Sequence, residues 1–197
     1  MARIEAEWNK ADILRLKLKL EALSGKKQKS VMANSINKVA RDFRKWEKED
    51  IRKRFAVKKV DSAPIRRASS SKLFAEVVYS IRTEKAGRKT AKAYTTSHFR
   101  VRKGTKRTPA TVQITKGKRS RIAIAGNKGF VTKDKLADGS IFARSTKHRL
   151  PIDITYGPTF RGMAHSPEFY QENLDEAQKD LYEEINKHIE KALAKGK

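Results

Sequence analysis

The sequence predicts an α+β protein, with one long helix in its N-terminal half, another at its C-terminus and short strands between them. Over residues 28–54 the apolar residues recur every three or four positions, as on one face of a helix. The same spacing follows Ser166. Between the two helices, runs of alternating apolar and polar residues are separated by Gly, Pro and Ser, which is typical of strands and turns.

Two short segments are expected before the first long helix. Residues 1–9 fit an edge strand, because Ile4, Ala6 and Trp8 alternate with charged residues. Residues 11–23 fit a helix whose apolar stripe is Ile13, Leu16, Leu20 and Leu23, widened by Leu14 and Leu18. The alternation of Leu14, Leu16, Leu18 and Leu20 also fits a strand, so both interpretations stay open. We predict an N-terminal segment of residues 1–27 and a single α+β domain of residues 28–197.

The first long helix carries one apolar seam, whose members step by four, three, four and three residues: Met32, Ile36, Val39, Phe43 and Trp46. Mostly Asn, Lys and Arg residues lie outside this seam. We therefore expect Phe43 and Trp46 to pack in the core rather than to form a binding site. At 1.5 Å per residue this helix spans roughly 40 Å.

Strands are predicted in the middle of the chain. A basic, irregular connection over residues 51–71 leads to a β-branched and aromatic run at residues 73–81, which predicts the first strand. Two more strands are expected around residues 99–102 and 110–114, with basic or polar side chains on their outward faces. Residues 84–93 are predicted to form a mobile loop.

Positive charge dominates the composition. The formal net charge is +25, which attracts polyanions through counterion release. Residues 82–128 hold fifteen Lys and Arg residues against the single acid Glu84, and they include predicted basic loops at 82–94, 103–109 and 115–121. Nothing here resembles a recognition helix, so we expect contact with phosphates and no base readout. The residues expected to make this contact are Lys85, Arg88, Lys89, Lys103, Lys106, Arg107, Lys116, Lys118 and Arg119.

Residues 121–158 predict a β-hairpin that ends where proline residues fix the backbone. Phe130 and Phe142 flank its turn and are placed to pair across it. Pro151 is expected to fix the chain direction after the strand, and Asp153 to pair with Arg149.

The last helix is expected to begin at Ser166-Pro167, a capping serine followed by a proline in the first turn. Its apolar stripe is Leu174, Ala177, Leu181, Ile185 and Ile189. Acids crowd its first half and lysines its end, which the helix dipole explains in part. The remaining asymmetry suggests a face that meets a basic surface of a neighbouring copy. The predicted subunit-interface residues are Phe130, Phe142, Arg144, Arg149, Asp175, Glu176, Asp180 and Glu183. Pairing of Arg144 and Arg149 within one subunit is an equal alternative.

No catalytic constellation is found in the sequence. There is no cysteine, and the four histidines, His98, His148, His165 and His188, have no metal-ligand spacing. Residues 125–129 lack the spacing of a phosphate-binding loop. We expect no catalytic residue, no metal, no cofactor and no enzymatic activity. No apolar run is long enough to span a membrane and no signal peptide opens the chain, so no membrane partner is expected.

The order of these segments resembles the minor tail protein Z family of tailed bacteriophages, which are tail-completion proteins. The resemblance rests on the helix around Ala33-Asn34-Ser35-Ile36-Asn37, the basic connection ending in Ile65-Arg66-Arg67, the hairpin, and Arg149-Leu150-Pro151-Ile152-Asp153 before Gly157-Pro158. It covers most of the chain from about Ala33 to the last helix.

The resemblance implies a small α+β subunit in which a curved antiparallel sheet packs against the two long helices. It also implies a homo-oligomeric ring, expected to be a hexamer, at the neck of the virion, assembled in the host cytoplasm. There the ring would join a tail-terminator or tail-tube protein to a head-side connector or stopper protein, with double-stranded DNA in its lumen.

Two other classes remain open. A cellular basic nucleic-acid-binding protein, associated with ribosomes or chromatin, shares this charge but is expected to act as a monomer or dimer. An enzyme such as a nuclease comes third, because clustered acids and histidines are lacking.

Overall fold

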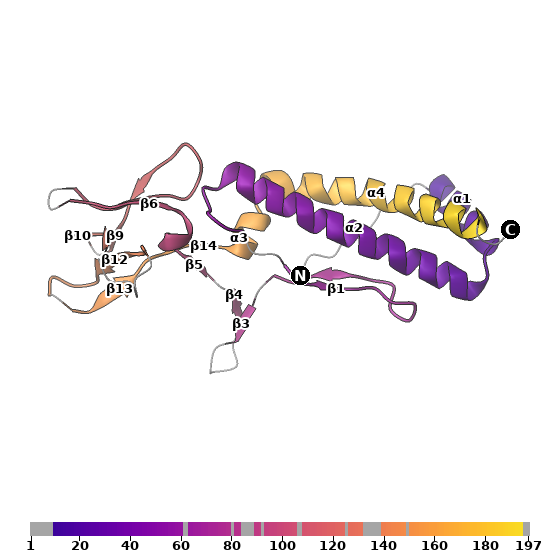
Figure 1. Ribbon diagram of the computed structural model, residues 1–197, viewed down its shortest axis with the longest axis horizontal. Coiled ribbons are helices and arrows are strands. Elements are labelled where there is room, and N and C mark those ends of the chain that lie inside the picture. The colour runs from indigo at the N-terminus through magenta and orange to yellow at the C-terminus, as the bar shows by residue number, and fades with distance from the viewer. Residues whose placement is uncertain are drawn as a thin grey trace. The chain divides into compact units, whose positions relative to one another are not determined.

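The computed structural model describes residues 10–60, 63–79, 81–83, 89–91, 93–105, 108–124, 126–131, 139–148 and 150–194. The chain forms two compact units. The first consists of Met1–Glu47, Ser62–Tyr79 and Ser166–Lys197, and the second of Lys48–Asp61 and Ser80–His165. The predicted α+β class is confirmed, with a long helix in each predicted place (Figure 1). The predicted division at residue 27 stays a prediction.

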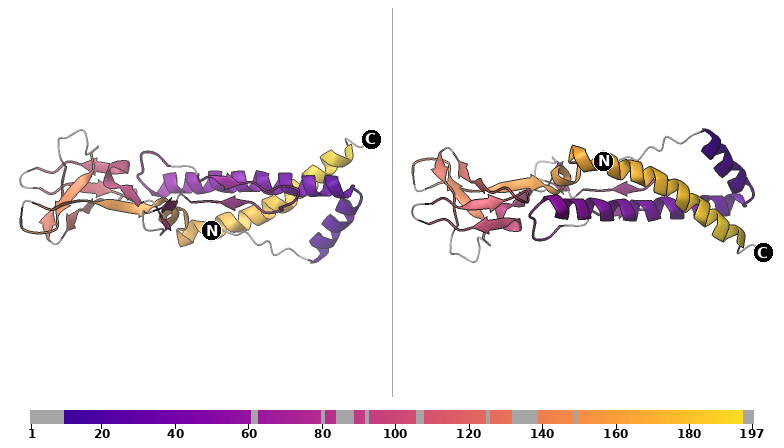
Figure 2. Two further views of the ribbon diagram at one scale, coloured as in Figure 1. Left: turned by 90° about the horizontal axis from the view of Figure 1, so that it is seen from below. Right: turned by 90° about the horizontal axis from the view of Figure 1, so that it is seen from above.

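Three helices build the first unit: α1 (Lys10–Glu21), α2 (Gly25–Arg54, which belongs to this unit as far as Glu47) and α4 (Pro167–Ala194). α2 and α4 run antiparallel, since Ser35 lies at Glu184 and the ring of Phe43 lies at that of Tyr170 (Figures 1 and 2). α4 begins as expected after Ser166, whose carbonyl accepts hydrogen bonds from the backbone of Phe169 and Tyr170. The predicted edge strand at residues 1–9 lies outside the described residues.

The segment that fitted both a helix and a strand is the helix α1, which packs on α4. Leu16 and Leu23 are buried with Val31 of α2 and with Ile185 and Ile189 of α4. The other side of α1 faces solvent: Leu14 is 59% and Leu18 61% exposed. The helix is therefore confirmed, with Leu16 buried and Leu20 partly buried on the predicted stripe. Ile13, at 48% exposure, and the two leucines expected to widen the stripe are not part of the core, and Leu23 follows the end of α1.

A small hairpin in the first unit packs on α2. Its strands are β1 (Ile65–Arg66) and β2 (Glu76–Val77). Asn37 of α2 donates to the carbonyl of Ala68 at 2.9 Å and accepts from its amide at 2.8 Å, and the hydroxyl of Tyr79 donates to the buried Glu47. The predicted strand at 73–81 is thus much too long. Leu73 and Phe74 are exposed and lie outside any strand. A strand continues only as far as the partner strand to which it is hydrogen-bonded, whatever the apolar pattern of its sequence.

The second unit contains most of the strands and one short helix. In chain order its elements are β3 (Ile81–Thr83), β4 (Lys89–Ala91), β5 (Ala93–Thr95), the 3₁₀ helix η1 (Thr96–His98), β6 (Arg100–Arg102), β7 (Thr111–Gln113), β8 (Ser120–Arg121), β9 (Ala123–Ile124), β10 (Asn127–Lys128), β11 (Phe130–Val131), β12 (Ile141–Arg144), β13 (Ile152–Ile154), β14 (Tyr156–Thr159) and α3 (Phe160–Ala164).

These strands form antiparallel sheets of two or three strands. The larger two have the orders β6-β7-β8 and β11-β12-β13, and the pairs are β3-β4, β5-β14 and β9-β10. In the described residues, the one curved sheet that the resemblance implies is thus divided into several smaller ones. Part of the loop predicted at 84–93 is strand, because Thr83 pairs with Lys89 and Ile81 with Ala91.

The core of the second unit forms around Phe99, which is fully buried. Gly157 lies so close to it that a Cβ atom there would approach Phe99 Cε2 to 2.4 Å. Thr96 and Thr155 tie the surrounding segments together. Thr96 Oγ1 accepts from the amide of Ile141 at 2.8 Å, and Thr155 Oγ1 donates to the carbonyl of Ile141 at 2.7 Å. This packing holds the two three-stranded sheets within one unit.

Candidate nucleic-acid interface

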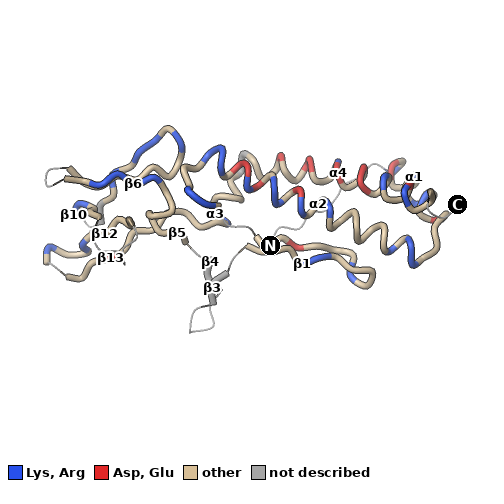
Figure 3. The backbone as a smooth tube through the Cα atoms, in the orientation of Figure 1, with Lys and Arg blue, Asp and Glu red and all other residues tan. Residues whose placement is uncertain are grey.

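Charge is divided unevenly between the two units. The second unit holds 27 Lys and Arg residues against 7 Asp and Glu, a net charge of +20. The first unit holds 20 against 15, a net charge of +5. Figure 3 shows most of the acids on α4 and α2 and several basic segments around β6. A polyanion is therefore attracted chiefly by the second unit.

One face of the β6-β7-β8 sheet is basic. Arg102, Thr111 and Arg121 lie directly opposite one another across the three strands, and Arg100 lies opposite Gln113 in the next row. Residues opposite one another share a face, as do residues two apart along a strand. All three arginines are exposed. The prediction that Arg100 and Arg102 point outward is confirmed, and we call this surface the basic face.

The other side of the same sheet explains why the basic side faces outward. Val101 lies opposite Val112, which is fully buried. Alternation then leaves the arginines on the solvent side. Within the described residues, no ion pair joins Arg100, Arg102 or Arg121 to a carboxylate.

A basic hairpin end extends this face beyond β6. The β6-β7 register continues to Thr105 and Thr108, where the amide of Thr105 donates to the carbonyl of Thr108 at 2.9 Å and the two side-chain hydroxyls lie 2.8 Å apart. Lys103 is exposed beside them. A side chain at Gly104 would meet the carbonyl oxygen of Thr108 at 2.4 Å, so this close approach requires glycine.

At the opposite end of β7, a tight turn presents three more basic side chains. Gly117 has a φ of 83°, a conformation that glycine adopts most easily, and the amide of Lys118 donates to the carbonyl of Thr115. Lys116, Lys118 and Arg119 are all exposed. The predicted basic loops at 103–109 and 115–121, the second of which ends in strand β8, therefore do not form one cluster. They lie at the two ends of β7, and the basic face connects them.

A basic segment that the sequence did not predict as part of the site borders this sheet. After α2 the chain continues extended: the amide of Ala56 donates to the carbonyl of Ile114 at 2.7 Å, and the amide of Lys58 donates to that of His98 at 2.8 Å. Lys58 and Lys59 are exposed. Sequence reasoning missed them because their pairing partners lie about forty to sixty residues away along the chain, although their charge was visible.

Of the nine residues predicted to contact phosphate, four are described with exposed side chains: Lys103, Lys116, Lys118 and Arg119. Lys89 begins β4. Lys85, Arg88, Lys106 and Arg107 lie outside the described residues.

The predicted interface residues Phe130, Phe142 and Arg144 come together on one sheet. Phe130 lies opposite Phe142, as predicted, with ring centroids 6.4 Å apart, and Phe142 lies opposite Ile154. The guanidinium carbon of Arg144 is 5.9 Å from the centroid of Phe130, and Arg144 lies opposite Ile152. We call the surface formed by these five residues the aromatic face. Arg149, and with it the ion pair expected with Asp153, lies outside the described residues.

The predicted acidic residues lie on α4. Asp175, Glu176 and Glu183 are exposed, and Asp180 is half-buried. Burial raises the pKa of the Asp180 carboxyl, and the negative charges of Glu176 and Glu183 add to this effect. Like charges therefore crowd on this helix.

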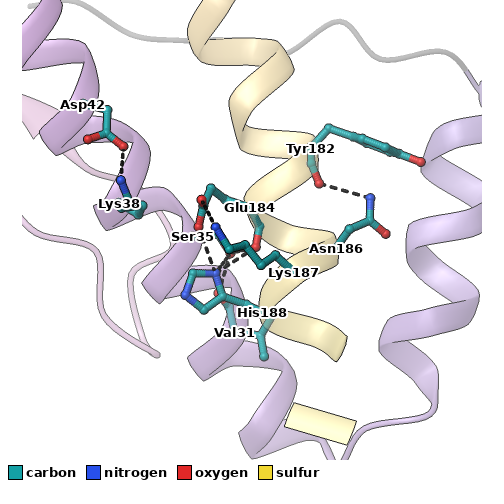
Figure 4. Close-up of polar contacts among 9 residues, drawn as sticks. All are labelled: Val31, Ser35, Lys38, Asp42, Tyr182, Glu184, Asn186, Lys187 and His188. Carbon is teal, nitrogen blue, oxygen red and sulfur yellow. Dashed lines mark hydrogen bonds and ion pairs between the residues drawn. The ribbon is translucent and has the colours of Figure 1, made fainter. Parts of the chain in front are cut away.

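A serine, a histidine and a glutamate also meet between α2 and α4, but their geometry is structural (Figure 4). Ser35 Oγ and the carbonyl of Glu184 both lie at His188 Nδ1, at 3.2 and 2.8 Å, and the Glu184 carboxylate lies 3.6 Å from the same nitrogen. A catalytic triad needs the hydroxyl and the carboxylate on different ring nitrogens. Ser35 is also fully buried, with its hydroxyl at the carbonyl of Val31. The cluster is best understood as a polar contact that fixes the two helices.

The described residues contain no group of three or more His, Asp or Glu side chains placed to hold a metal ion. None of their helices is long and apolar enough to cross a membrane.

Comparisons of the chain with family models, with curated proteins and with solved structures found no match.

Proposed function

We propose that the protein is a structural virion protein of a tailed bacteriophage, a tail-completion protein that forms a ring around the DNA channel at the neck. The single observation that carries the DNA-contacting part is the basic face, which places three exposed arginines on one side of a sheet with basic turns at both ends of β7. The neck location and the ring are supported by the resemblance in the order of the segments.

The basic face suits contact with the DNA backbone. The basic face holds Arg100, Arg102 and Arg121, and the turns at the two ends of β7 add Lys103, Lys116, Lys118 and Arg119. With this set of exposed cations, about six phosphate contacts are expected. Lys and Arg neutralise phosphates without reading bases, and a duplex held in this way remains free to slide. This is the property that a genome channel requires.

Charge reversal tests the DNA-contacting part. The variant Arg100→Glu/Arg102→Glu/Arg121→Glu should bind a double-stranded DNA fragment at least about ten-fold more weakly at 100 mM salt, because three phosphate contacts are lost. Fluorescence anisotropy of the full chain with a labelled fragment measures this change.

The matched control is Lys26→Glu/Lys27→Glu/Lys29→Glu on α2, which changes the net charge equally on three exposed residues of the first unit. It should retain most of the affinity. Equal losses in the two variants would show that total charge, and not the basic face, controls binding.

Assembly and genome context test the virion part. Six copies should form a ring visible by electron microscopy, and the gene should lie beside capsid, connector or tail-tube genes. A chain that binds nucleic acid tightly only as a monomer or dimer would instead fit a cellular nucleic-acid-binding protein.

A further inference from the structure

The aromatic face is a partly exposed apolar surface on a sheet whose other side is buried. Ile141 and Ala143 of β12 are fully buried, so alternation turns Phe142 and Arg144 to the opposite side. Phe130, Phe142 and Ile154 remain half-buried there, and Ile152 is 38% exposed. Contiguous apolar surface of this kind marks a site of protein contact.

The chain that follows β12 enlarges this surface. Ile152, Ile154 and Tyr156 alternate through β13 into β14, and Tyr156 is 58% exposed. Leu150, which precedes β13, is 68% exposed. Thr155, which lies between Ile154 and Tyr156, is buried, and its hydroxyl donates to the carbonyl of Ile141. An apolar row therefore extends the aromatic face along one strand direction.

Charge indicates what kind of surface covers it. Arg144 is the charged residue of the aromatic face, and the unit that carries this face has a net charge of +20. A partner surface must therefore supply carboxylates. This chain has such a surface on the outward side of α4, where Glu172, Glu176 and Glu183 are exposed at spacings of four and seven residues. We call these three residues the acidic stripe.

A positive charge placed at the acidic stripe would reduce the repulsion among the carboxylates of α4. Glu176 and Glu183 crowd Asp180, so like charges on α4 repel one another in the isolated chain. A guanidinium brought between them would relieve that repulsion. Half-buried Phe169 lies seven residues before Glu176, on the same side of the helix, and offers apolar surface to the aromatic face.

We propose that the aromatic face of one copy binds the acidic stripe of a second copy of this chain, with Arg144 between Glu176 and Glu183. Because the two surfaces differ, the contact is heterologous and adds copies in one direction, as a ring requires. The inference rests on the self-association in the proposed function and names the contact that would produce it.

A charge swap tests the contact in the full chain. Arg144→Glu should weaken self-association by about ten-fold or more, since it places like charges in the contact. Glu176→Arg/Glu183→Arg should weaken it similarly. The chain that carries all three substitutions should recover most of the wild-type association. Sedimentation equilibrium at 100 mM salt measures each constant, and far-UV circular dichroism confirms folding.

Lys147→Glu is the matched control, because this exposed residue follows β12 outside the aromatic face. It should associate like the wild-type chain. A wild-type chain that stays monomeric, an Arg144→Glu variant that behaves like Lys147→Glu, or a swap that restores nothing would each overturn the proposal. DNA affinity should match in Arg144→Glu and Lys147→Glu, so this failure is separable from a failure of the basic face.

Discussion

The pKa of Asp180 on α4 depends on the residues around it. Its carboxyl is half-buried, and burial together with the charges of Glu176, Glu183, Asp42 and Glu184 raises its pKa. The folded state thus holds a proton on Asp180 more tightly than the unfolded chain does. The charged carboxylate therefore destabilises the fold at pH values above this raised pKa, and the cost disappears as the pH falls below the ordinary value of about 3.9.

Asp180→Asn should therefore raise the melting temperature at pH 7, because the amide carries no charge to repel its neighbours. The advantage should shrink as the pH is lowered towards 4, where the wild-type carboxyl takes up its proton. Thermal unfolding followed by circular dichroism at both pH values checks this. Glu190→Gln, at an exposed position of the same helix, removes the same charge and should change little. Equal stabilisation by both would point to net charge instead.

Gly157 carries a second prediction at the scale of single residues. Gly157→Ala should destabilise the protein by about 1–3 kcal/mol, since the new methyl group would overlap the ring of buried Phe99. Urea unfolding measures the change. Gly25→Ala is the control, because a Cβ atom at Gly25 meets nothing within 4 Å. A tolerated alanine at residue 157 would mean that the ring moves aside.

Single residues of the site were partly predictable. Strict alternation was enough to point Arg100 and Arg102 outward, because the period of a strand is a local property. It was not enough to find Lys58, whose amide bonds to His98, or the approach of Gly157 to Phe99. Those contacts join distant parts of the chain, and a sequence pattern carries no record of them.

Among the elements, α1 offers the clearest test, because its sequence fitted two structures. Leu16→Ala should cost about 2–5 kcal/mol, as it removes a side chain buried against α4. Leu18→Ala should stay within about 0.5 kcal/mol, since Leu18 is 61% exposed. Chemical denaturation of both variants checks this. Similar costs would contradict the helical face assigned to α1.

The helices were easier to predict than the strands for a physical reason. A helix makes its hydrogen bonds within one segment, so the spacing of Val39, Phe43 and their neighbours was sufficient for α2. A strand ends where its partner ends. The run at 73–81 looked like one long strand, yet only Glu76 and Val77 find partners in β1.

For the whole molecule, the basic face predicts DNA binding that depends strongly on salt and little on sequence. A plot of log affinity against log salt should have a slope of about −5, as expected for six phosphate contacts. Competition between unrelated DNA fragments of equal length should show less than about three-fold preference, because phosphates carry no sequence information. A strong preference for one fragment would contradict backbone contact.

The composition predicted a basic protein, but not where its charge lies. The net charge of +25 divides into +5 and +20 only once the two units are known, and these units interleave three segments with two. The long helix α2 contributes residues to both. No boundary read along the chain could have separated them.

A surface that recognises only phosphate tolerates evolutionary change. On a phosphate-binding surface of the kind we propose for the basic face, lysine can replace arginine, and a charge lost at one position can reappear two residues away, with little effect on the affinity for DNA. Gly157 has no such freedom, because the ring of Phe99 occupies the space beside it. Distant relatives should therefore retain Gly157 more often than any single Lys or Arg of the basic face.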